Sequence, residues 1–343
     1  VYRNDRRRLA PWSLPIPAAD GDGTTALAVP DGRGGRILLI GQSSWEADSV
    51  AAMLRIPSVL GIPLGASGAP TGPADGDLDL VVGGRAVPGA YPLTPPTRLY
   101  HNDGTGRFTL DRVNTAQLGG MGMVSALLFT DWDLDGDPDL VATVEGGPVR
   151  VYRNDGGRFT AVTAELGLDG RFSRWLGLAS GDFDADGRPD LVVTSWGRNI
   201  RPSADSLRPL YLYFGNFGEG RTLDLLLARH DERLGALAPL ASFARLSRAA
   251  PEIARRLRTF EAYADATVEE VLGPAFASAR RLGINHVEHL VLLNRGDRFE
   301  ARPLPLEAQL APAFAPVVAA SHGRRDGDPP PRRKFSPPYD ETP

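Results

Sequence analysis

The sequence contains no cysteine, a single lysine (Lys334) and no long uninterrupted apolar run. Without cysteine there are no disulfides, cysteine-ligated zinc sites, iron–sulfur clusters or thiol nucleophiles. No stretch approaches the roughly 18 consecutive apolar residues that cross a membrane, so we expect no membrane span in this chain. The formal net charge is −4, whereas nucleic-acid-binding proteins favour a basic face. We therefore expect no nucleic-acid partner.

The 343 residues include 39 glycines and 30 prolines, which indicates many tight turns. Two acidic segments, Asp131–Asp139 and Asp182–Asp190, follow one template, D-x-D-x-D-G-x-P-D, and each continues with Leu-Val. A weaker copy keeps Asp75, Asp77 and Asp79 but has lost the first two acidic positions. That copy offers too few side-chain oxygens to bind a metal tightly.

A second signature follows each acidic segment, consisting of an Asn-Asp-Gly turn and then phenylalanine. It occurs at Leu99–Gly104 with Phe108, at Val151–Gly156 with Phe159, and more loosely at Leu292–Gly296 with Phe299. The closing aspartates at 79, 139 and 190 are 60 and 51 residues apart, close to the repeat length of propeller blades. Short strands bounded by Gly, Asp, Asn and Pro complete the pattern. The sequence predicts an all-β fold, an incomplete β-propeller with a small α-helical insertion.

The composition changes along the chain. Residues 229–283 are rich in Ala, Leu, Arg and Glu, and Thr267-Val-Glu-Glu270 forms a capping box, so we expect short helices there. The expected division is propeller blades over 1–228, a helical insertion over 229–283, a returning blade over 284–322, and a disordered or frame-shifted tail over 323–343. Because the first five residues recur unchanged at 151–155, we expect the chain to begin inside a repeat and to be a fragment.

Each acidic loop places several carboxylates close together, and their repulsion favours a bound cation. Calcium takes six to eight hard oxygen ligands, which loop positions 1, 3, 5, 7 and 9 can supply. An EF-hand needs a glutamate at position 12, where this chain has Ala142 and Val193. Acidic turns without metal are the alternative, although turn preference does not explain aspartate at positions 1, 3, 5 and 9 twice. The predicted calcium ligands are Asp131, Asp133, Asp135, the carbonyl of Asp137 and Asp139, and, in the second loop, Asp182, Asp184, Asp186, the carbonyl of Arg188 and Asp190.

These loops, with the Asn-Asp-Gly turn and phenylalanine, resemble the FG-GAP/VCBS repeat of integrin-α-like β-propellers. Three further segments resemble bacterial UnbV/ASPIC-associated VCBS proteins: Leu80–Pro92, Phe260–Thr267 and Pro303–Gln309. The resemblance implies an extracytoplasmic propeller with Ca²⁺ in its blade loops and no assigned catalytic residues.

The expected function is that of a calcium-stabilised extracellular or periplasmic propeller, a binding scaffold for a protein or carbohydrate ligand. A purely structural module of a larger surface protein and a carbohydrate-processing enzyme are the alternatives. We expect no enzyme, because the chain has neither a G-x-S-x-G motif nor a P-loop. His286 and His289 suggest a site, but strand alternation predicts that they face opposite ways.

Overall fold

The computed structural model describes residues 79–318, apart from 88, 104–106, 218–222 and 250, and the backbone of five strands nearer the N-terminus. The chain forms two compact units. One consists of Val1–Val81 and Leu99–Asp111, and the other of Val82–Arg98 and Arg112–Pro343. Asp75 and Asp77 of the weaker acidic copy and the tail over 323–343 lie outside the described residues.

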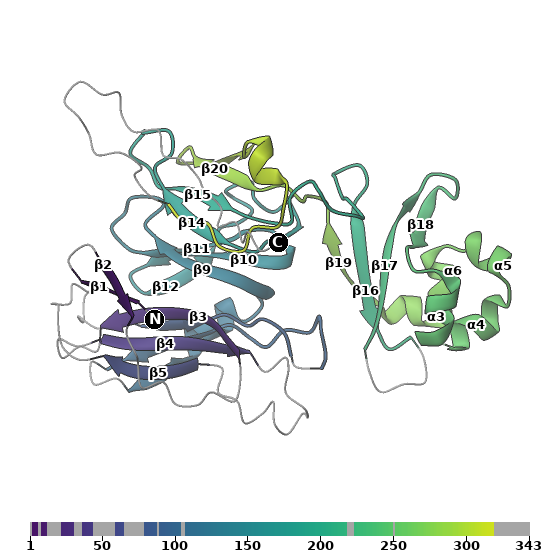
Figure 1. Cartoon of the computed structure of the whole chain (residues 1–343), viewed down its shortest axis with the longest axis horizontal. Helices are drawn as coiled ribbons and strands as arrows, with labels where there is room; N and C mark the ends of the chain where they lie inside the picture. Colours follow the sequence, from purple (N-terminus) through teal and green to yellow (C-terminus); the bar gives the residue numbers. More distant parts are fainter. Residues whose placement is uncertain are drawn as a thin grey trace. The chain divides into compact units, whose positions relative to one another are not determined.

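The strands of the first unit form antiparallel sheets (Figure 1). Asp5 pairs with Arg8, and Asp155 pairs with Arg158 in the same register in the second unit. The first five residues and their repeat at 151–155 therefore form the same kind of hairpin. The sheets are β1 (Tyr2–Asp5) with β2 (Arg8–Pro11); β3 (Asp22–Pro30), β4 (Arg36–Ser43) and β5 (Val59–Leu64); and β6 (Leu80–Val82), β7 (Arg98–Asn102) and β8 (Phe108–Asp111).

The second unit contains a four-stranded antiparallel sheet that we call blade A, whose strands pair in chain order. Its first two strands flank the loop 131–138, and Asn154 pairs with Phe159 across the last two. A short helix packs beside the fourth strand, and a two-residue strand pairs with the far end of the second. The elements are β9 (Met123–Thr130), β10 (Asp139–Gly147), β11 (Arg150–Asp155), β12 (Arg158–Ala161), α2 (Arg112–Leu118) and β13 (Ser173–Arg174).

Blade B repeats this plan with a long interruption. Its strands pair in the order β14–β15–β20–β21, and Asn294 faces Phe299 as Asn154 faces Phe159. Residues 194–289 leave the blade between its second and third strands and then return to it. The elements are β14 (Leu178–Gly181), β15 (Asp190–Val193), β20 (Leu290–Asn294), β21 (Phe299–Pro303) and the 3-10 turn η2 (Leu306–Gln309).

Blades A and B share one hydrophobic core. Val141 and Val151 of blade A lie in the same cluster as Leu191 and Leu292 of blade B, all at most 1% exposed. Trp132 and Trp175 belong to this core as well. The strands are buried because hydrophobic side chains on facing sheets exclude water from each other. This packing fixes the two acidic loops at the entrances of β10 and β15.

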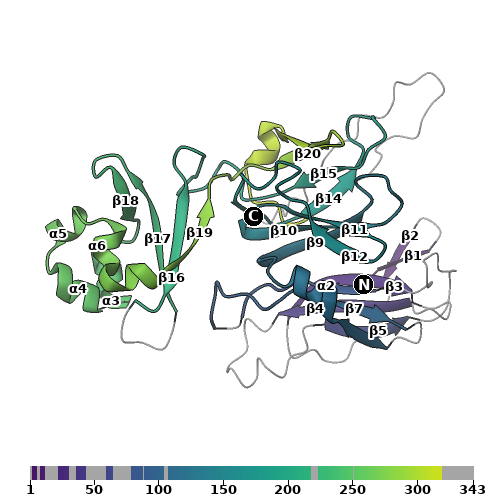
Figure 2. The same cartoon turned by 180° about the vertical axis from the view of Figure 1, so that it is seen from behind.

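The interruption builds a sheet of its own, in the order β18–β17–β16–β19, with helices on one side of it (Figures 1 and 2). The helices pack through Ile253, Val271 and Leu272 against Tyr213 and Leu226 of the sheet. The elements are β16 (Leu210–Gly215), β17 (Asp224–Asp231), β18 (Ala236–Pro239), α3 (Phe243–Ala249), α4 (Pro251–Leu257), α5 (Phe260–Ala264), α6 (Val268–Leu272), the 3-10 turn η1 (Gly273–Ser278) and β19 (Arg280–Ile284).

The predicted all-β class with a few short helices is confirmed. The capping box is also present, because Thr267 Oγ1 accepts the N–H of Glu270 while Glu270 accepts the N–H of Thr267. The helices α3 to α6 and the turn η1 lie within the predicted range 229–283, which also holds β18 and all of β19 except Ile284, whereas α2 and η2 lie outside it. The domain bounds at 228, 283 and 322 stay predictions.

Candidate metal centres

The first acidic loop, residues 131–138, is wound around the carboxylate of Asp131. Asp131 accepts backbone N–H bonds from Asp135 and Gly136, both 3.1 Å long. Leu134 and Gly136 have positive φ values of 64° and 100°, so the chain turns sharply enough to return to β10. The template glycine at position 6 is therefore required by the backbone.

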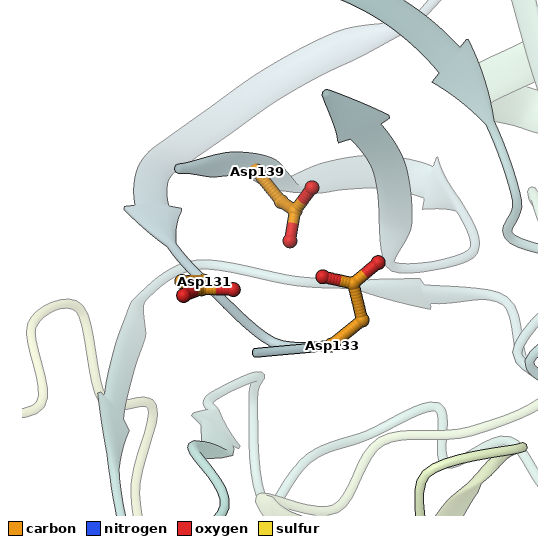
Figure 3. A group of neighbouring side chains, drawn as sticks. All are labelled: Asp131, Asp133 and Asp139. Atoms are coloured by element: carbon orange, nitrogen blue, oxygen red, sulfur yellow. The ribbon is translucent and has the colours of Figure 1, made fainter. Parts of the chain in front are cut away.

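Three carboxylates of this loop converge. One oxygen each of Asp131, Asp133 and Asp139 lies within 4.8 Å of the others, and Figure 3 shows the groups turned toward one another. Burial raises the pKa of Asp133, and the charges of Asp135 and Asp131 raise it further. Burial also raises the pKa of Asp139, to about 6, against the opposing effect of its backbone hydrogen bonds. Gathering these charges is therefore unfavourable unless a cation neutralises them.

The second loop, residues 182–189, repeats the geometry. Asp182, Asp184 and Asp190 bring one oxygen each within 4.8 Å of the others. Asp182 Oδ2 accepts the N–H of Gly187, whereas Asp182 Oδ1 is buried with no hydrogen-bond partner among the described residues. Burial raises the pKa of Asp190. An unpaired buried carboxylate oxygen next to two further carboxylates is a donor set of the kind that hard cations such as Ca²⁺ prefer, although in this loop Arg295 already pairs with Asp184.

The aspartate at position 9 has a structural role in both loops. Asp139 is fully buried and accepts the N–H of Trp132 at 3.1 Å and that of Asn154 at 2.8 Å. Asp190 is equally buried and accepts the N–H groups of Phe183 and Asn294, both at 2.8 Å. Each carboxylate therefore joins its own loop to the third strand of the blade.

The weaker copy that ends at Asp79 retains part of this arrangement, and so does the segment Asn216–Asp224, which keeps only the two ends of the template. Asp79 accepts the N–H of Asn102 at 3.0 Å, and Asp224 accepts the N–H of Phe217 at 2.8 Å. Neither copy contributes a metal-sized group of carboxylates in the described part of the chain. Asp79 thus keeps the bond to a neighbouring strand, and Asp224 keeps the bond within the loop.

Not every predicted ligand belongs to one of the two groups of three converging carboxylates. Asp135 Oδ1 and Asp186 Oδ1 accept the N–H groups two residues later, at 2.9 Å each. The side chain of Asp137 accepts the N–H of Gly156. Ligation by Asp135, by Asp186 and by the carbonyls of Asp137 and Arg188 stays a prediction. Sequence reasoning missed the strand partners Asn154 and Asn294, although both stand at the asparagine of the second signature.

His286 and His289, which suggested a site in the sequence, do not lie together. His286 lies against Trp175 with ring centroids 5.7 Å apart, and burial lowers its pKa. His289 points into the core, where its Nδ1 accepts the N–H of Ser195 at 2.8 Å and its Nε2 lies 2.9 Å from the carbonyl of Ala311. They therefore belong to different environments, and no joint site forms between them.

A cleft of about 740 Å³ lies where the interruption leaves and rejoins blade B. Two of its lining residues form an ion pair, in which Arg198 Nε donates to Glu288 Oε1 at 2.6 Å. Its polar lining includes Arg171, Arg198, Ser203, Ser206, His286 and Glu288.

Comparison with known proteins identifies the repeats. Residues 74–142 and 131–193 match the family model of the FG-GAP-like repeat, and these ranges hold both acidic loops. A search of curated proteins found no match. The chain thus contains FG-GAP-like repeats, and its blades have the propeller-type all-β fold predicted from the sequence. None of the helices in the described part of the chain has the length and apolar character needed to cross a bilayer.

Proposed function

We propose that this chain is a calcium-stabilised β-propeller module that works outside the cytoplasm as a binding scaffold. The observation that carries the proposal is the convergence of Asp131, Asp133 and Asp139 within 4.8 Å at a strand entrance, repeated in the second loop. Calcium, when bound, supplies a divalent charge that neutralises these carboxylates. The chain's own residues supply the frame, because Asp139 and Asp190 each join a loop to the third strand.

The proposed location follows from the expected affinity. These loops lack the bidentate glutamate of an EF-hand, so we expect binding in the range of extracellular modules, about 10⁻⁴ to 10⁻³ M. Such sites fill in extracellular calcium but stay empty at cytosolic concentrations. The FG-GAP-like repeats support an extracellular or periplasmic setting.

The proposed partner is a protein or a carbohydrate, and the cleft is the first place to look for it. Arg171, Ser203 and Ser206 line it and are exposed, and the Arg198–Glu288 pair also lines it. Guanidinium, hydroxyl and carboxylate groups can bind hydroxyl-rich or peptide ligands by hydrogen bonds. A purely structural module would leave this cleft without a ligand.

A binding scaffold needs no catalytic step, so we propose that the chain is not an enzyme. The proposed kinship with UnbV/ASPIC-associated proteins rests on the three segments quoted above. One of them places Tyr91 beside Glu145, where its hydroxyl donates to Glu145 Oε1 at 2.8 Å.

Calcium titration of the full chain by calorimetry, with melting curves in calcium and in chelator, tests the proposal. We expect saturable binding and a higher melting temperature in calcium. Asp133→Asn should abolish most of the calcium-dependent rise, because it removes one of the three converging carboxylates. Asp169→Asn is the control, since Asp169 is exposed and outside both loops. Absence of binding heat together with equal melting temperatures in calcium and chelator would refute the proposal.

A further inference from the structure

The two acidic loops differ in the residue that follows the asparagine of the third strand. Asn154 and Asn294 occupy the same register, facing Phe159 and Phe299. The next residue is Asp155 in blade A but Arg295 in blade B. A carboxylate in one blade is thus replaced by a guanidinium in the other.

Arg295 lies on the carboxylates of the second loop. Its Nη1 is 2.6 Å from Asp184 Oδ2 and 3.6 Å from Asp186 Oδ2, and its Nε is 3.0 Å from Glu300 Oε2. Only 26% of its side chain is exposed. Asp184 is one of the three carboxylates that converge there, so a permanent positive charge already neutralises part of the group.

A second charge reversal lies beside the first. Loop position 7 is Asp137 in blade A and Arg188 in blade B. Asp137 Oδ2 accepts the N–H of Gly156, whereas Arg188 packs on the matching turn, so that a Cβ added to Gly296 would lie 2.7 Å from its Nη1. Blade B therefore carries two guanidiniums at positions where blade A carries two carboxylates.

In the part of the chain that the structure describes, no cation pairs with the converging carboxylates of the first loop in this way. The guanidinium of Arg153 pairs with Asp155 at 3.0 Å, and both side chains are well exposed, at 39% and 52%. No ion pair joins Arg153 to Asp131, Asp133 or Asp139 among the described residues. Arg153 thus acts on Asp133 through its charge alone, without an ion pair that would occupy the converging carboxylate oxygens of blade A.

We propose that Arg295 is a built-in counter-cation that holds the second loop folded without metal, so that calcium fills only the loop at 131–139. The inference rests on the calcium function proposed above. A guanidinium held by the fold competes at a high effective concentration, millimolar or more, and it occupies ligand oxygens of Asp184. A calcium ion that binds with a dissociation constant of about 10⁻⁴ to 10⁻³ M would have to break this ion pair before it could bind Asp184.

Calorimetric stoichiometry on the full chain tests this assignment. We expect one calcium per wild-type chain, no binding to Asp133→Asn, and unchanged binding to Asp184→Asn. Arg295→Gln should add a second site by raising the affinity of the second loop at least tenfold, and should lower the melting temperature in chelator but not in calcium. Arg298→Gln is the matched control, because Arg298 lies in the same turn and is 65% exposed.

The outcomes separate the two proposals. Two sites in the wild type, one of them removed by Asp184→Asn, would overturn the role of Arg295 and leave the calcium function standing. A single site that persists in Arg295→Gln would also overturn it. No binding to any variant would refute the calcium function itself. Because the wild type and Asp184→Asn decide the stoichiometry, the test does not depend on Arg295→Gln folding.

Discussion

The buried carboxylate of Asp139 accepts the backbone N–H of Asn154 at 2.8 Å, fifteen residues further along the chain. Its other oxygen accepts the N–H of Trp132 at 3.1 Å. The same group is one of three carboxylates that converge in the loop. Asp139 thus combines hydrogen bonds to its loop and to a neighbouring strand with a role in the proposed calcium site.

Asp139→Ala separates these two roles. The change leaves two backbone donors without an acceptor, so we expect a loss of about 2 to 3 kcal/mol of unfolding free energy in chelator as well as in calcium. Asp133→Asn should lose stability only in calcium, because Asp133 makes no comparable bond to a neighbouring strand. Urea unfolding in both conditions measures this. Equal behaviour of the two variants in chelator would contradict the structural role of Asp139.

Glu145 offers a second prediction. Its side chain is 4% exposed and is held by Arg85 at 2.5 Å, Arg174 at 2.6 Å and the hydroxyl of Tyr91. Glu145→Ala leaves two partly exposed guanidiniums and the hydroxyl of Tyr91 without their acceptor, so we expect a loss of about 1 to 3 kcal/mol in urea unfolding. Asp205→Ala is the control, because Asp205 pairs with Arg208 on the exposed surface and should change the midpoint little. A loss below about 1 kcal/mol for Glu145→Ala would contradict the prediction.

The acidic loops were predictable because their pattern is local. Asp131, Gly136 and Asp139 lie within nine residues, and each has a role that its spacing predicts: carboxylate, sharp turn and strand entry. The capping box at Thr267 is local in the same sense.

The second signature at Leu292–Gly296 indicated a returning blade, but the contacts of its residues with the second acidic loop were not predictable from local pattern. The bond from the N–H of Asn294 to Asp190 spans 104 residues, and the contact of Arg295 with Asp184 spans 111. No periodicity carries information over such separations. Arg295 was visible in the sequence as a departure from Asn-Asp-Gly, but only the fold shows which carboxylates it meets.

Histidine titration gives a pH-dependent prediction. Burial disfavours the charged imidazolium and so lowers the pKa of His289 below its usual 6.5, and the unprotonated Nδ1 accepts the N–H of Ser195. Between the lowered pKa of the folded state and pH 6.5, the unfolded chain binds a proton at this histidine and the folded chain does not. The free energy of unfolding therefore decreases as the pH falls below 6.5.

His101 should behave in the opposite way. The hydrogen bond to Asp79 raises its pKa, and Asp111 raises it further, so its contribution is present below pH 6.5 and lost as the pH rises through the folded pKa. Ring-proton NMR titration of the folded protein should place His289 below 6.5 and His101 above it. The reverse order would show that these environments are assigned wrongly.

Gly197 and Gly235 form a matched pair for the last prediction. Both have positive φ, 76° and 62°, which costs any other residue about 1 kcal/mol. A Cβ on Gly197 would lie 2.5 Å from the carbonyl oxygen of Gln309, whereas one on Gly235 would meet nothing within 4 Å. Gly197→Ala should therefore cost clearly more than Gly235→Ala, by about 1 to 3 kcal/mol in urea unfolding, because the backbone around Gln309 must shift. Equal costs would mean that the backbone around Gln309 moves without any loss of unfolding free energy. The close approach of Gly197 to Gln309 would then not constrain the fold.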